Sequence, residues 1–209
     1  NTTHDLTNTT ANTIPPGTHT YEVKAKTFAT LTDTLNVTAN QTVTLTMHYT
    51  TEWDGSTTVE PQKDGETYLI SNSYELAWFR DEVNKGNYTL NARLTENINL
   101  GGHPWTAISK LTDTSAKTGY KGTFDGNGKT ISGLNPVGEL ISGKYRGAGL
   151  FGYVYTGGTV KNVTVEGAMK AEWNCGGVVA YLAGGRVENC VNRMNITPRS
   201  ESIYLYYVG

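Results

Sequence analysis

Apolar and polar residues alternate along the first part of the chain. The alternation runs through residues 20–25, 34–38 and 42–47, with turn-forming residues between these runs. A period of two is typical of strands that bury one face, so residues 1–51 are predicted to form a small β-sandwich module. Three strands seldom bury enough apolar surface to be stable alone, and residues 1–13 supply no convincing further strand. The module is therefore expected to be incomplete or to lean on its neighbour.

After residue 71 the spacing of the apolar residues changes to that of an α-helix. One apolar stripe is formed by Leu76, Phe79 and Val83. Asn72 is placed to cap the first turn, with Glu75 in the position of a capping box, and Lys85-Gly86 is a helix stop. Residues 72–85 are therefore predicted to be a helix. We expect it to cover the open end of a β-structure, whose backbone groups would otherwise be unpaired.

Residues 149–192 contain the same pattern twice. Tyr153 matches Tyr181 at an offset of 28 residues, and Val160-Lys-Asn-Val163 matches Val187-Glu-Asn-Cys190 at an offset of 27. A fainter third copy would place Ile131 and Leu134 in the slots of Val160 and Val163, 29 residues earlier. Short β-branched runs, glycine turns and no intervening helix predict β-helix coils of about 27–29 residues. The repeated slots Val160, Val163, Val187 and Cys190 should point inward and stack.

Composition and charge narrow the function classes. Charged residues make up 17% of the chain and the net charge is −2, which argues against a nucleic-acid-binding protein. No apolar run is long enough to span a membrane. The two cysteines cannot build a disulfide framework. Cys190 is interpreted as a small buried hydrophobe, with a disulfide to Cys175 as the alternative. The apolar residues 202–209 suggest that the natural protein continues downstream.

A family resemblance is carried by Gly122-Thr-Phe-Asp-Gly-Asn-Gly-Lys-Thr-Ile-Ser-Gly-Leu134, by Gly149-Leu-Phe-Gly152 and by the repeated Gly-Gly-x-Val-x-Asn. Over residues 66–192 the chain resembles the GLUG-motif repeat region of bacterial cell-surface proteins. Such regions occur in adhesin-like proteins and in the non-catalytic part of IgA1-protease-like (M26) metallopeptidases. The resemblance implies a right-handed parallel β-helix and a cell-surface setting. Residues 14–47 resemble part of a PEGA or carboxypeptidase-regulatory-like β-sandwich.

The sequence contains few residues in patterns that indicate catalysis, metal binding or ligand binding. The four histidines are scattered and no H-E-x-x-H motif occurs, so no catalytic metal, no cofactor and no peptidase activity are expected. Asp125 lies in a glycine turn and is interpreted as structural, and Lys161 and Glu188 should form an exposed ion pair. Trp173 has no aromatic counterpart in the first copy. With Glu172 and Asn174 beside it in a loop between coils, it is the candidate sugar-stacking residue. The alternatives are that Trp173 fills a local gap or contacts a further coil downstream.

Together these patterns predict an all-β chain with a β-sandwich module at 1–51, a linker at 52–65 and a capped β-helix at 66–209. The function expected is a non-catalytic segment of a secreted or surface-attached bacterial protein. It would bind a host glycan or a surface protein, or act as a spacer, in a polypeptide with further domains. The first alternative is the scaffold of an M26-like metallopeptidase without its catalytic domain. The second is a polysaccharide-processing β-helix enzyme.

Overall fold

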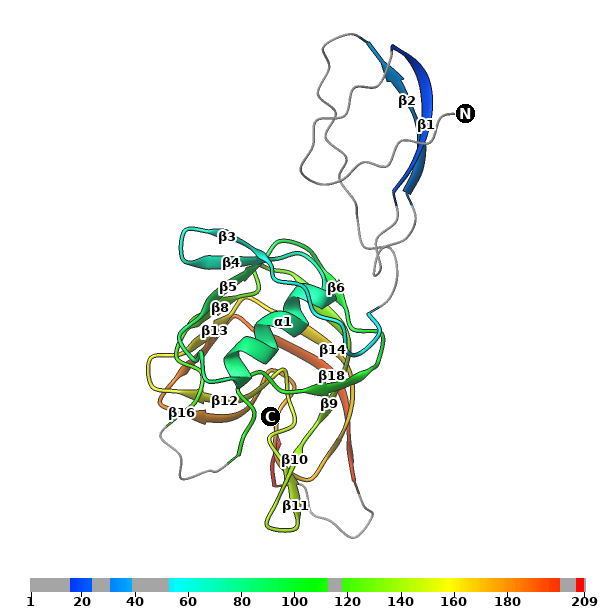
Figure 1. Cartoon of the computed structure of the whole chain (residues 1–209). Helices are drawn as coiled ribbons and strands as arrows, with labels where there is room; N and C mark the ends of the chain where they lie inside the picture. Colours follow the sequence, from blue (N-terminus) through cyan, green and yellow to red (C-terminus); the bar gives the residue numbers. More distant parts are fainter. Residues whose placement is uncertain (1–15, 24–30, 39–52, 113–117, 200–205, 209) are drawn as a thin grey trace. The chain divides into compact units, whose positions relative to one another are not determined.

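The computed structural model describes residues 16–23, 31–38, 53–112, 118–199 and 206–208 (Figure 1). The chain divides into two compact units, Asn1–Thr51 and Glu52–Gly209. In the first unit, β1 (Gly17–Val23) pairs with β2 (Leu31–Val37) in antiparallel register. These strands coincide with two of the predicted alternating runs. The third run, 42–47, lies outside the described residues.

The second unit is a parallel β-helix. Its longest sheet has the order β17-β13-β8-β5-β4-β3. All neighbours are parallel except β3 and β4, which form a hairpin at one edge. The strands of this sheet are β3 (Gln62–Asp64), β4 (Thr67–Ile70), β5 (Asn91–Leu94), β8 (Thr123–Asp125), β13 (Thr159–Lys161) and β17 (Arg186–Glu188). Each successive coil thus contributes one strand to the same face, as predicted.

Three further faces are built in the same way from the remaining strands. One face contains β6 (Ile98–Asn99), β7 (Pro104–Thr106), β9 (Thr130–Val137), β14 (Thr164–Ala171) and β18 (Val191–Pro198). A second contains β10 (Glu139–Ile141), β11 (Lys144–Arg146), β15 (Trp173–Cys175) and β19 (Tyr206–Val208). The third contains β12 (Phe151–Tyr155) and β16 (Val179–Ala183). Within these faces β10 is antiparallel to β11, and the other pairs are parallel.

The predicted stacking is confirmed for Val160 and Val187, and the inward position is confirmed for Val160 and Val163. Val160 pairs with Val187 in adjacent coils, and both Val160 and Val163 are buried. The proposed third copy has the wrong register, because Val160 pairs with Phe124 and not with Ile131. Hydrogen-bonded positions in neighbouring coils are 27 residues apart at the C-terminal end but 32 to 34 apart in earlier coils. The coil from β8 to β13 is longer still because it contains the β10–β11 hairpin.

The last coil leaves its inward positions uncovered. Val154 and Val160 are completely buried, whereas their register partners Leu182 and Val187 are 48% and 38% exposed. Among the described strands, none pairs on the far side of β17 or β18. Within the described residues, the hydrophobic core therefore lies inside the earlier coils.

Helix α1 (Ser73–Asn84) lies across the ring of strands in Figure 1 and closes the other end. Asn72 Oδ1 accepts the Glu75 N–H at 3.0 Å, which confirms the predicted cap. The Glu75 carboxylate reaches one residue further back than a capping box requires, to the Ser71 N–H at 2.7 Å. The apolar stripe faces inward, and the Phe79 ring packs against the rings of Tyr120 and Phe124.

The segment predicted to be a linker packs on the β-helix instead. Trp53 is fully buried, and its ring meets that of Trp105 edge to face with the ring centroids 5.8 Å apart. Asp54 forms a turn by accepting hydrogen bonds from Ser56 and Thr57. Because Trp53, the first described residue of the segment, is a large buried aromatic residue, this segment belongs to the second unit, which begins at Glu52.

Both cysteines are free thiols, so the disulfide alternative is not realised. Cys175 is buried in a small apolar cluster with Ala148, Met169 and Ala171. Burial raises the pKa of the Cys175 thiol, against smaller opposing hydrogen bonds. The half-buried Cys190 occupies the inward slot that the repeat predicted, and burial raises its pKa too. Both side chains therefore serve as small apolar residues.

Candidate functional site

Trp173 does not lie in a loop, as its sequence context suggested, and it does have a partner in the neighbouring coil. It is the first residue of β15 and pairs in register with Arg146 of β11. The Arg146 guanidinium carbon lies 5.2 Å from the centroid of the indole ring, in a cation–π contact. One face of this half-buried indole is therefore occupied by the protein itself, which leaves less aromatic surface for a sugar.

Glu172 and Asn174 are likewise held by the coil stack. Glu172 is 5% exposed, and its carboxylate accepts the Tyr145 N–H at 2.9 Å and lies 3.5 Å from Lys144 Nζ. The Asn174 carbonyl accepts the Gly147 N–H at 3.0 Å. The three candidate residues are adjacent, as predicted. However, the carboxylate that was expected to bind sugar hydroxyls instead joins β15 to β11.

The tyrosines of the repeat form a ladder. Tyr153 and Tyr181 are register partners, and their ring centroids are 5.2 Å apart in an edge-to-face arrangement. Tyr155 adds a further edge-to-face contact to Tyr153 and carries Lys121 Nζ over its ring at 5.5 Å. These rings pack mainly on one another and on the strands between them, so the ladder stabilises the β12–β16 face.

The acidic residue in the glycine turn has a structural role. Burial alone would raise the pKa of Asp125, but hydrogen bonds from Asn162, the Asn127 N–H and Lys161 outweigh it and hold the pKa below its ordinary value. Lys161 Nζ lies 3.3 Å from the Asp125 carboxylate. The predicted pair between Lys161 and Glu188 is not formed, because Lys161 turns to the preceding coil and Glu188 binds Arg186 at 2.9 Å.

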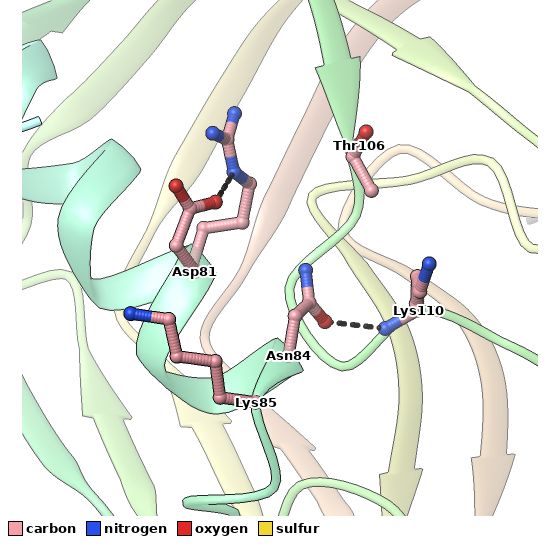
Figure 2. A pocket seen from close by; sticks show the side chains of 6 residues that line it. Asp81, Asn84, Lys85, Thr106 and Lys110 are labelled. Atoms are coloured by element: carbon pink, nitrogen blue, oxygen red, sulfur yellow. Dashed lines mark hydrogen bonds and ion pairs between the residues drawn. The ribbon is translucent and has the colours of Figure 1, made fainter. Parts of the chain in front are cut away.

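A pocket of about 340 Å³ lies beside the last turns of α1 (Figure 2). Its walls are formed by Arg80, Asp81, Asn84, Lys85, Thr106 and Lys110. Figure 2 shows Asp81, Asn84 and Lys85 on the helix, with Thr106 and Lys110 on the facing segment. Asn84 joins the two walls, because its Oδ1 accepts the Lys110 N–H at 2.9 Å and its Nδ2 donates to the Ala107 carbonyl at 3.0 Å.

Arg80 is the most unusual residue of this pocket, and sequence reasoning missed it. Only 8% of the residue is exposed. Its guanidinium carbon lies 4.7 Å from the Trp105 ring centroid and 5.5 Å from that of Trp53. Its Nε donates to Asp81 Oδ1 at 2.7 Å. A buried arginine has no sequence signature here, because a helix position outside the apolar stripe is ordinarily expected to face solvent.

Among the side chains that the structure describes, no three His, Cys, Asp or Glu residues lie together as a group that could hold a metal ion. No helix described by the structure is long and apolar enough to cross a membrane.

No family model matches the chain, and no solved structure matches it. The chain is similar to a curated protein, Halomucin of Haloquadratum walsbyi (strain DSM 16790 / HBSQ001), with 33% identity over 110 residues. The match covers 53% of this chain but 1% of Halomucin. The chain thus spans a very small part of the length of this relative, and the likeness to GLUG-motif regions stays a prediction.

Proposed function

We propose that this chain is a non-catalytic scaffold segment of a secreted or surface-attached bacterial protein. Its stacked coils would act as a spacer and present a surface to a glycan or a protein partner. The observation that carries the proposal is the coil stack itself, in which residues of equivalent position bury one another. Val160 is buried between Phe124 and Val187, while Val187 is exposed because no described strand covers it. Such dependence of each unit on its neighbour is typical of repeat scaffolds.

The use of the reactive side chains supports a structural role. The Glu172 carboxylate binds the backbone and a lysine of the preceding coil, and Asp125 holds a turn. A glycosidase needs two carboxylates free to face one bound sugar. Both of these carboxylates are engaged in coil-to-coil contacts. The similarity to a short stretch of Halomucin is compatible with a module inside a much longer polypeptide.

A coil insertion tests the scaffold role. A second copy of residues 159–185, inserted after Gly185, would add one coil in the register of β13 to β16. Because each coil contacts mainly its neighbours, we expect the variant to stay folded, with a melting temperature equal to or above that of the parent. A matched insertion of the same residues in scrambled order should lower the melting temperature. If both insertions behave alike, the coils are not interchangeable scaffold units.

Catalysis is tested separately on the parent chain. Incubation with acidic and neutral polysaccharides should release no reducing ends and no unsaturated uronate products. Turnover that disappears in Asp125→Asn or Glu172→Gln would replace the scaffold proposal with a polysaccharide-processing enzyme.

A further inference from the structure

The pocket beside α1 has no part in the scaffold role and contains an incompletely paired buried cation. The Arg80 guanidinium has five N–H donors. Within the described residues, one acceptor is assigned to them, the Asp81 carboxylate at Nε. The rings of Trp53 and Trp105 lie near the guanidinium carbon and stabilise its charge. Among the described side chains, the buried nitrogen atoms that lack a partner belong to Arg146 and Arg199. The Arg80 Nη donors therefore reach the open pocket, where solvent or a ligand can accept hydrogen bonds from them.

The walls of the pocket carry more positive than negative charge. Arg80, Lys85 and Lys110 line it together with one carboxylate, that of Asp81. Lys85 is partly neutralised, because its Nζ lies 2.6 Å from Glu82 Oε1. Lys110 is exposed and has no ion pair among the described side chains. The C-terminal end of a helix adds a partial negative charge, which the lysines at this end offset.

We infer that this pocket binds the carboxylate of a small acidic molecule. The Nη groups of Arg80 would donate to the two carboxylate oxygens, which is the geometry that a guanidinium favours. Lys110 would add a second positive charge, and the Thr106 hydroxyl lies in the wall where a ligand hydroxyl could meet it. Because the Asp81 carboxylate is close to Arg80, a singly charged carboxylate is favoured over a doubly charged phosphate. Hexuronic acids carry one such carboxylate together with hydroxyl groups, so they match both the charge and the hydroxyl of this pocket.

Intrinsic fluorescence provides the test, since two tryptophans flank the guanidinium that would bind the ligand. Titration of the whole chain with glucuronate at low ionic strength should give a saturable change, and titration with glucose should give none. Inorganic phosphate should bind more weakly than glucuronate. Titration with acetate tests whether the sugar hydroxyls contribute to binding. If acetate gives the same response as glucuronate, the site recognises carboxylates in general and not sugar acids. That outcome keeps the inference, whereas phosphate binding more tightly than glucuronate would overturn it.

Variants of two lysines test whether glucuronate binds in the pocket and not elsewhere on the surface. Lys110→Ala should weaken glucuronate binding about two- to fivefold, the range expected for one exposed charge, and Lys110→Glu should weaken it further. Lys170→Ala, at an exposed lysine of β14 outside the pocket, should leave binding unchanged. Arg80→Gln should abolish binding, provided that its circular dichroism spectrum matches the parent. No saturable response to glucuronate, or equal binding by the parent and Lys110→Glu, would overturn the inference.

Discussion

The two valines of one ladder offer a controlled test of the coil stack. Val160 and Val187 are register partners, and the substitution to alanine removes the same atoms from each. Val160 is fully buried, while Val187 is 38% exposed. The same chemical change is therefore made at a covered and at an uncovered position of one column. Any difference in the free energy of unfolding reports the burial that the next coil supplies.

The expected magnitudes follow from the buried surface. Removal of two methyl-sized groups costs about 1.6 kcal/mol in transfer free energy at roughly 0.8 kcal/mol each. At Val160 the neighbours on both sides, Phe124 and Val187, would leave a cavity, which brings the total to about 2–3 kcal/mol. At Val187 about a third of the side chain is already in water and the site opens outward, so the loss should be about 1 kcal/mol or less.

Urea unfolding followed by circular dichroism at 25 °C measures both values. The midpoint should fall much further for Val160→Ala than for Val187→Ala, with the same dependence on denaturant. Hydrogen exchange should be faster in β17 and β18 than in β13 and β14, because the former have an unpaired edge. Equal losses of stability in the two variants would refute the reasoning, since they would mean that the last coil is covered as well as the one before it.

Two further predictions concern the first coil and its cap. Phe79→Ala should destabilise the chain by about 3–5 kcal/mol, because it empties a fully buried aromatic site under α1. Leu140→Ala, at a side chain that is 62% exposed, is the control and should change stability by less than about 0.5 kcal/mol; coincident urea curves for the two variants would show that α1 is not docked. Hydrogen bonds from the Thr57 side chain and from the Thr57 and Ser56 backbone lower the pKa of Asp54 to about 2. The stability from this carboxylate is therefore complete above its ordinary pKa of 3.8 and is lost as the pH falls through about 2, so the NMR titration of Asp54 should have its midpoint near 2. A midpoint near 3.8 would show that the turn does not hold the carboxylate.

The repeat could be predicted from the sequence where residues of the same type stack in neighbouring coils. Tyr153 lies beside Tyr181, and Val160 beside Val187, because parallel strands in register place equivalent side chains together. The third copy was placed in the wrong register for a physical reason. Ile131 and Leu134 are buried apolar residues like Val160 and Val163, so an alignment that is wrong by one strand still matches apolar with apolar. The insertion of the β10–β11 hairpin changed the coil length, and no residue pattern marked that change.

The surroundings of the candidate site could not be predicted from the repeat. Trp173 was expected to lack a partner one period away, but it pairs in register with Arg146 of the preceding coil and with Tyr206 of the following one. Glu172 binds a backbone N–H, which has no counterpart in a side-chain pattern. Arg80 lies on the cap helix outside the apolar stripe, and its burial depends on Trp53 and Trp105, which come from distant segments. Contacts of this kind depend on the three-dimensional packing of the first coil, and local periodicity does not encode them.

The two ends of the β-helix differ in how their strand edges and apolar side chains are covered. At the first coil, α1 covers the core with its apolar stripe, and the Trp53 segment packs beside it. At the last described coil, the edges of β17 and β18 carry unpaired backbone groups above exposed aliphatic side chains. A further strand can therefore add in register on β17 and β18, since an uncovered edge is a template for pairing. The pocket at Arg80 is formed by the cap helix and the coil segment beneath it. Coils that stack on β17 would leave those residues unchanged, so a binding site at the cap is compatible with a stack of any length.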